Sequence, residues 1–366
     1  MRGRRNTVRR VAALGLLTLA AGGCGSSQIV DRIALVQTAG YDRAEGHIVT
    51  SLQVGEYTDK DKTKIKLLES DSTNSFDMMP QLNLETNKPI EYGQMKMMLF
   101  GRSYAEHGIG DVLKILSRDV KVQSRCLLAV SETTALEAMR ATSNTDDTLF
   151  LMNMIWQNTK TANLKGQNLQ QILYGYHGTG SDIFLPYITI NKQHRAQLGG
   201  VALFKDDRVV AVAREAEVLY LKLLSERSRE GSLLVKLRAS GGSQPYLLLR
   251  VLSSHPKFKL VSAGPVPSIR IRVAMTVMIK SISETVKIEN EAEAKRLERV
   301  IKRYVETGMS DFIAKCQGLR VDPIGFGDFV RTHRRGWDSV AFYEAYPSMK
   351  TEVRVSVKLL QSGIID

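Results

Sequence analysis

Cysteine, tryptophan and histidine are scarce in this sequence of 366 residues, which holds 3 Cys, 2 Trp and 6 His. So few cysteines exclude a small scaffold held together by disulfides. Aromatic residues make up only 7% and do not alternate with basic ones, which disfavours a surface that stacks nucleic-acid bases. Beyond the N-terminal segment no stretch approaches about 18 consecutive apolar residues, so the sequence predicts no channel or transporter.

The motifs of common catalytic and metal sites are also missing. H-E-x-x-H, C-x-x-C, G-x-S-x-G and the glycine-rich phosphate-binding patterns do not occur. Ser254 and Lys257 match S-x-x-K in form, but Pro256 between them opposes the helical turn which that chemistry needs. Glu215 and Glu217 fit a helix start better than acid–base catalysis. We therefore predict that the protein is not an enzyme and holds no metal or cofactor.

The charge is clearly basic, with 51 Lys and Arg against 38 Asp and Glu, a net charge of +13 and a pI of about 9.6. Such a balance indicates an anionic partner, which could be nucleic acid, an anionic membrane surface or another polyanion. Which of these applies depends on the compartment, and the N-terminus bears on that. The remaining interpretation is that the excess charge is only solvated surface.

The N-terminus has the pattern of a secretory signal peptide. Residues 1–10 contain five Arg and no acid, and residues 11–21 form an apolar run too short to span a bilayer. The small residues 21–23 then lead directly into Cys24, as in a bacterial lipobox. We predict that residues 1–23 are removed and that the Cys24 thiol carries a diacylglyceryl group. The alternative is a plain signal peptide with an incidental cysteine.

Export changes the interpretation of the charge. Removing residues 1–23 removes five Arg, so the mature chain of 366 − 23 = 343 residues carries 13 − 5 = +8. A protein outside the cytoplasm is not expected to bind nucleic acid, whereas a basic surface suits anionic lipid. The remaining cysteines, Cys126 and Cys316, lie in apolar segments and are predicted to be buried free thiols.

The apolar pattern of the mature chain predicts an α+β fold of several domains, with mixed or antiparallel sheets and packed helices. The strands are expected at 33–36, 47–54, 90–100, 124–130, 184–190, 198–204, 209–213, 232–238, 245–252, 266–281 and 353–359. The helices are expected at 109–116, 133–139, 148–173 with a break near 165, 214–227 and 291–316. Residues 40–42 are expected to form a turn after the first strand.

A division of the chain is predicted near residues 191–198. Residues 178–182 are rich in small residues and are interpreted as a flexible junction. The extended segment 184–190 follows, and Pro186 predicts that it lies at a sheet edge. The expected organisation is a signal peptide at 1–23, an N-terminal region at 24–190, and a C-terminal α+β domain at 199–366.

Several segments, in their order and spacing, resemble the GerAC-type lipoproteins, the C subunits of spore germinant receptors. The first are residues 31–42, residues 92–101, where Gln94 replaces the usual His, and residues 111–119. Two more specific blocks lie in the C-terminal half. Their signature residues are Gly199, Gly200, Phe204 and Glu217 in the first block, and Gln317, Asp322, Gly325, Gly327 and Trp337 in the second. The tether departs from the family, because Gly25 and Ser26 follow Cys24 where Trp and Asp are common.

The resemblance implies three α+β domains without known enzymatic activity, two of them within residues 25–190. It implies a lipoprotein on the outer face of the spore inner membrane. Its expected partners are two integral-membrane receptor subunits, of A and B type, in a receptor whose assembly and signalling trigger germination. The signature residues are expected to be structural or to lie at an interface.

Two other functions stay open at this point. A solute-binding lipoprotein of an importer would have two similar lobes with parallel sheets and a cleft between them. A wall-modifying enzyme would have to use acids such as Glu215 or Glu217, for which the sequence offers no catalytic context.

Overall fold

The computed structural model describes most of the chain after the N-terminal segment. The described residues are 33–360, except 60–61, 73–77, 143–144, 146, 238–244, 285 and 287. The predicted signal peptide and Cys24 lie outside them. Within this part of the chain, no helix is both long enough and apolar enough to cross a membrane.

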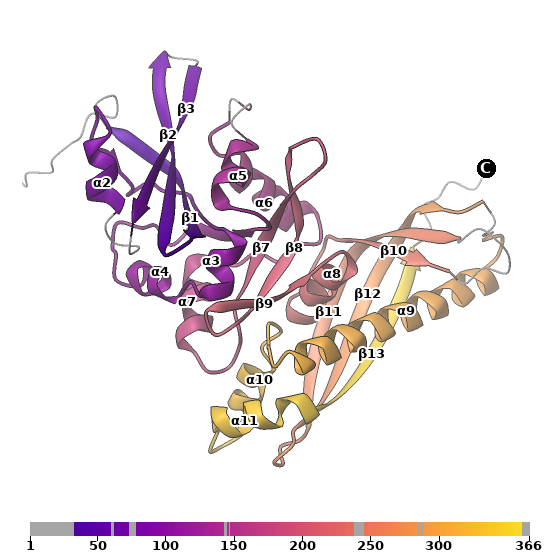
Figure 1. The fold of residues 1–366 in the computed structure, drawn as a ribbon. Helices are drawn as coiled ribbons and strands as arrows, with labels where there is room; N and C mark the ends of the chain where they lie inside the picture. Colours follow the sequence, from indigo (N-terminus) through magenta and orange to yellow (C-terminus); the bar gives the residue numbers. More distant parts are fainter. Residues whose placement is uncertain are drawn as a thin grey trace, which may run out of the picture.

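The described strands form two sheets, and the first is built by the N-terminal half (Figure 1). It has nine described strands in the order β3-β2-β1-β5-β6-β7-β8-β9, with β4 beside β1. Their bounds are β1 Ala34–Ala44, β2 His47–Asp59, β3 Lys62–Ser72, β4 Ile90–Glu91, β5 Met97–Phe100, β6 Leu127–Ser131, β7 Phe184–Ile190, β8 Ala196–Lys205 and β9 Arg208–Ala213. Antiparallel hairpins flank a parallel centre of β1, β5, β6 and β7.

Helices cover both faces of this parallel centre because its strands are apolar on both sides. In β5, Met97 and Leu99 face one core, while Met98 and Phe100 face the other. The first core is covered by α5 (Ala135–Arg140) and α6 (Phe150–Thr161). The second is covered by α3 (Arg102–His107), α4 (Gly110–Leu116) and α7 (Leu169–His177), while α2 (Met78–Leu84) packs beside β3.

The second sheet has the order β10-β11-β12-β13, and the described helices that pack on it lie on one of its faces (Figure 1). Its strands are β10 Ser232–Lys236, β11 Tyr246–Ser262, β12 Ser268–Ile282 and β13 Lys350–Leu360. The covering helices are α8 (Ala216–Ser225) and the long α9 (Glu291–Gly318). The short helices α10 (Phe326–His333), α11 (Ser339–Ala345) and η2 (Tyr346–Ser348) connect α9 to β13.

The long helix α9 is amphipathic, and its sequence explains both its start and its packing. The Asn290 side chain accepts a hydrogen bond from the backbone of Glu293, which caps the first turn. An apolar stripe is buried against the sheet; it contains Leu297, Ile301, Val305, Met309, Phe312 and Ile313.

Two glutamates of α9 also reach the edge strand β13. Glu306 accepts a hydrogen bond from the backbone N–H of Val355 at 2.8 Å, and Glu298 accepts one from Leu359 at 2.8 Å. Two outward N–H groups of β13 are therefore bonded by side chains of the helix, which partly protects this edge.

The predicted α+β class with mixed sheets is confirmed. The N-terminal hairpin, the hairpin of β8 and β9, the long helix and the terminal strand lie where the sequence predicts them. Both sheets are mixed, and they differ in size, unlike the two similar parallel lobes expected for a solute-binding protein. β7 and β8, which lie on the two sides of the predicted division near residues 191–198, pair with one another in one sheet. The division of the chain there and its organisation into three domains therefore stay predictions.

Three predictions about the strands of the first sheet were wrong. Residues 40–42 lie inside β1, and the turn comes at Gly46, which has φ +78°. Residues 90–100 form two short strands, because a turn closed by the Met95 N–H and the Tyr92 carbonyl interrupts them. Pro186 is not in an edge strand, since β7 pairs with β6 and β8. β6 reaches only Tyr187 and the residue after it, so no ladder partner from β6 opposes the proline.

The two glycines of the first signature block lie at an irregularity in the pairing of β7 and β8. The register shifts between the pairs of Tyr187 with Gly200 and Ile188 with Leu198, so Gly199 is the extra residue of a bulge. Gly200 has φ +148°, and a Cβ there would collide with the backbone oxygen of Ala213. Only glycine fits this position without strain.

Replacing Gly200 by Ala should therefore destabilise the first sheet. Gly46→Ala is the matched control, because Gly46 also has a positive φ but no heavy atom within 4 Å of an added Cβ. We expect Gly46→Ala to lower the free energy of unfolding by about 1 kcal/mol and Gly200→Ala by about 1–3 kcal/mol more. Denaturant unfolding of both variants measures the difference, and equal losses would contradict the close approach.

Candidate functional site

The candidate site lies where the N-terminal half meets the second sheet. The segment between α7 and β7 docks there on the loop that begins α10. The Asp182 N–H donates to the Asp322 carbonyl at 2.9 Å, and the Asp322 N–H donates to Oδ2 of Asp182 at 2.7 Å. The Asp328 N–H donates to the Gly180 carbonyl at 2.7 Å. We call these contacts the clasp.

The interpretation of residues 178–182 as a flexible junction was wrong, because the backbone of Gly180 and Asp182 is held by these hydrogen bonds.

Glycines make the clasp possible because two backbones come into contact in it. A Cβ on Gly327 would lie 2.6 Å from the carbonyl oxygen of Gly180, and one on Gly180 would collide with the Asp328 side chain. Gly325 precedes α10 in the left-handed conformation, with φ +88°. The signature glycines at 325 and 327 thus provide a turn and a close approach.

Asp322 is the buried centre of the clasp, with no solvent exposure. Its carboxylate accepts hydrogen bonds from the N–H groups of Gly325 at 2.9 Å and Gly327 at 2.8 Å. Burial raises the pKa of Asp322 to about 7, and these backbone hydrogen bonds oppose the rise because they favour the ionised form. The nearby Asp182 adds to the rise.

Asp182 connects the clasp to the β8–β9 hairpin. Nζ of Lys205 lies 3.3 Å from Oδ1 of Asp182, whose side chain is 9% exposed. Burial raises the pKa of Asp182, and the Lys205 ammonium opposes this shift. The same ammonium lies 4.5 Å from the ring centroid of Tyr343 in α11, so one cation contacts both halves of the chain.

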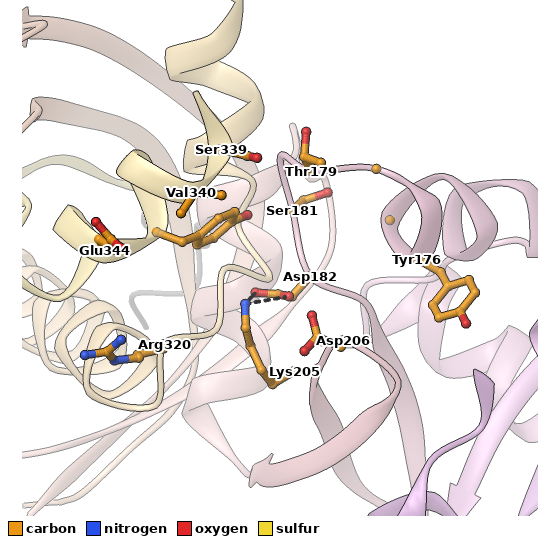
Figure 2. A pocket seen from close by; sticks show the side chains of 13 residues that line it. Tyr176, Thr179, Ser181, Asp182, Lys205, Asp206, Arg320, Ser339, Val340 and Glu344 are labelled. Carbon is orange, nitrogen blue, oxygen red and sulfur yellow. Dashed lines mark hydrogen bonds and ion pairs between the residues drawn. The ribbon is translucent and has the colours of Figure 1, made fainter. Parts of the chain in front are cut away.

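A pocket of about 380 Å³ opens beside the clasp (Figure 2). Figure 2 shows Asp182 and Lys205 pointing toward one another in it, with Asp206 from the hairpin tip and Arg320 and Glu344 from the C-terminal half around them. Both signs of charge line the pocket, so an ion or zwitterion is the ligand class it could accept. The described residues contain no group of three or more His, Cys, Asp or Glu side chains suited to a metal ion.

Two further signature residues fix the last turns of α9 to their surroundings. Glu217, in the first turn of α8, accepts hydrogen bonds from Nζ of Lys315 at 2.9 Å. The buried Gln317 donates from Nε2 to the carbonyls of Tyr346 at 3.1 Å and Met349 at 2.8 Å. These contacts hold α8, α9 and the segment just before β13, from Tyr346 to Met349, together.

The other signature residues lie apart from the clasp. Phe204 is fully buried in the core under α3, α4 and α7. Trp337 packs on Phe342 with ring centroids 4.8 Å apart, and its Nε1 has no hydrogen-bond partner among the described residues. The structure therefore brings together Asp322, Gly325 and Gly327, whereas the role of the whole set at an interface with a partner stays a prediction.

Sequence reasoning missed Asp182, Gly180 and Lys205. Asp182 and Asp322 are 140 residues apart, so no local spacing connects them. The only available signal was the small-residue run before Asp182, which also fits a loop.

Cys126 and Cys316 are buried and unpaired, as predicted. Burial raises the pKa of the Cys126 thiol to about 12 and also raises that of Cys316, so neither is a reactive thiolate near neutral pH.

Comparison with known proteins covers nearly the whole chain. The family model for the spore germination protein N-terminal domain matches residues 26–190. The model described as spore germination B3/GerAC like, C-terminal, matches residues 199–363. Among curated proteins, spore germination protein GerQC of Bacillus cereus is 25% identical over 347 residues, 94% of this chain and 96% of that protein.

Two further similarities agree with this. The putative spore germination protein YfkR of Bacillus subtilis (strain 168) is 21% identical over 304 residues, 78% of this chain and 76% of that protein. The crystal structure of the GerBC protein superimposes with a TM-score of 0.58 at 14% identity, covering 91% of this chain and 100% of that chain. The structural likeness shows that the fold is shared.

The buried carboxyl of Asp322 should make stability depend on pH. An unfolded aspartate ionises near pH 3.9, whereas the native pKa is about 7. Between these values the unfolded state releases a proton that the native state keeps, so the contribution of Asp322 to stability falls as pH rises from about 4 to about 7. The stability difference between wild type and Asp322→Asn should therefore shrink or reverse over this range.

Denaturant unfolding of both proteins at steps from pH 4 to pH 8 tests this. The wild type is the control, because the two proteins share every other titrating group. A difference that stays constant across the range would show that Asp322 ionises equally in both states.

Proposed function

Since this chain belongs to the GerAC-type family of spore germination proteins, we propose that it is the lipoprotein C subunit of a nutrient germinant receptor, needed for receptor assembly and signalling. The observation that carries the proposal is the ordered match of both family models, over residues 26–190 and 199–363. Fold likeness alone would not support a function.

Membrane attachment through Cys24 is part of the proposal. It is supported by the basic head, short apolar run and small residues that precede this cysteine. Two acyl chains on Cys24 would anchor the protein stably, since each buried methylene contributes about 0.8 kcal/mol. The protein would then lie on the outer face of the spore inner membrane.

The proposed role is that of a structural subunit rather than a catalyst. The clasp joins the two halves, while the Glu217–Lys315 ion pair and the contacts of Gln317 hold the elements of the C-terminal half together. All three use hydrogen bonds that involve buried or half-buried groups. Such a body can present fixed surfaces to membrane partners, here proposed to be the integral A- and B-type receptor subunits.

Deleting the gene should leave spores that form normally but fail to germinate with particular nutrients. Loss of optical density after addition of each nutrient measures this. Defective uptake of a solute by growing cells, with normal germination, would instead favour a solute-binding lipoprotein. Unchanged germination with every nutrient, in a strain without a paralogue, would refute the proposal.

Replacing the lipid-bearing Cys24 should abolish attachment to the membrane while the protein still folds. Cys24→Ala should move the protein from the membrane fraction to the soluble fraction or to the uncleaved precursor, and weaken the germination response. Cys126→Ala is the control, because this thiol is buried and has no expected role in attachment. Membrane fractionation and immunoblotting of spores provide the readout. Membrane attachment of Cys24→Ala protein of the mature size would show that another feature holds the protein.

A further inference from the structure

The face of the β10–β13 sheet that points away from α9 has no helix on it in the described part of the chain. Strand alternation divides the two faces: Ile271 and Val273 are buried toward α9, while Arg272 and Ala274 are exposed on the other side. Figure 1 shows α8 and α9 together on one side of this sheet.

Three cations lie side by side across the centre of the uncovered face. Lys257 in β11 pairs in register with Arg272 in β12, and Arg272 pairs with Arg354 in β13. Neighbouring strands are about 4.8 Å apart, and like charges directly opposite one another destabilise a sheet. Lys257 and Arg272 have no acidic partner within 4 Å among the described residues, so no ion pair within this part of the chain relieves the repulsion between these two cations.

More cations extend this row along the strands. We define the basic face by six residues: Lys257, Lys259, Arg270, Arg272, Arg354 and Lys358. Its register positions carry one acid, Glu352, which is shared by ion pairs to Arg270 and Arg354. The centre of the face is hollowed by about 580 Å³, and no acidic side chain lines the hollow.

Exposed apolar side chains lie near both ends of the basic face. Val261 and Val266, at the turn between β11 and β12, are 51% and 44% exposed, and Leu360 at the other end is 39% exposed. Cations between apolar residues suit the boundary between phosphate headgroups and acyl chains, where both kinds of side chain find partners.

We propose that the basic face docks on the anionic phospholipid surface of the membrane that holds the protein. This rests on the proposed anchor at Cys24. The ten-residue separation between Cys24 and Ala34 can span at most ~35 Å, which would keep the fold within reach of the surface. Cations spread over three strands, with exposed apolar side chains near both ends, suit a lipid surface, because its headgroups can meet all of these side chains at once.

Lysine footprinting of the lipidated full-length protein in vesicles tests the proposal. In phosphatidylglycerol vesicles, acetylation of Lys257, Lys259 and Lys358 should be several-fold slower than in phosphatidylcholine vesicles. Lys295 and Lys302 on α9 serve as internal controls and should react equally in both. One molar salt should abolish the protection, because it screens charges beyond about 3 Å.

A charge variant with a matched control extends the test. Lys257→Gln, Arg272→Gln and Arg354→Gln together should abolish the protection of Lys259 and Lys358, with roughly a 100-fold loss of surface affinity at about fivefold for each charge. The control changes three exposed arginines of α9, Arg296→Gln, Arg299→Gln and Arg303→Gln, and should keep the protection. The first variant should stay folded, because it removes the repulsion within the row. The Arg354–Glu352 ion pair that it also removes is solvent-exposed, and such pairs contribute little to stability.

Each other outcome overturns the proposal. Equal acetylation in both kinds of vesicle would show that the face does not contact lipid. Protection in native spore membranes but not in phosphatidylglycerol vesicles would assign the face to an acidic protein partner instead. Failure to enter either kind of vesicle would point to a missing anchor and so to an error in the proposed function.

Discussion

The reciprocal pairing of Asp182 and Asp322 is the contact on which the arrangement of this molecule depends. It joins a loop of the first sheet to the helical connection of the second, and a buried carboxylate lies at its centre. Burying that charge is costly, and the N–H groups of Gly325 and Gly327 offset part of the cost, while Lys205 does the same for the carboxylate of Asp182. A buried polar contact of this kind is sensitive to geometry, so it allows few relative placements of the two halves.

Local elements could be predicted from the sequence because their patterns repeat within a few residues. The alternation of apolar and polar residues around Arg270 predicted β12 correctly, and the 3–4-residue spacing of apolar residues from Leu297 to Cys316 predicted α9 correctly. The clasp could not be predicted, because it joins residues 140 apart and uses backbone groups that every residue has. The resemblance pointed to Asp322 and its glycines but not to Asp182. Asp182 follows a run of small residues, a composition that is also typical of a loop.

The two faces of the second sheet show how one element can serve stability and binding together. On the covered face, α9 buries its apolar stripe and supplies the packing that holds the sheet. On the other face, the row through Arg272 carries repulsion that opposes folding. The covered face must therefore contribute more stability than a sheet without that row would need.

The glutamates that α9 places along β13 also limit how this protein can associate. Many complexes form when one chain continues the sheet of another, which requires a strand with free backbone donors and acceptors. Glu298 and Glu306 already occupy two N–H groups on the outer edge of β13, which hinders such growth along this part of the strand. Among the described strands, β10 and the end strands β3 and β9 of the larger sheet offer edges where no side chain of a covering helix is bonded in this way.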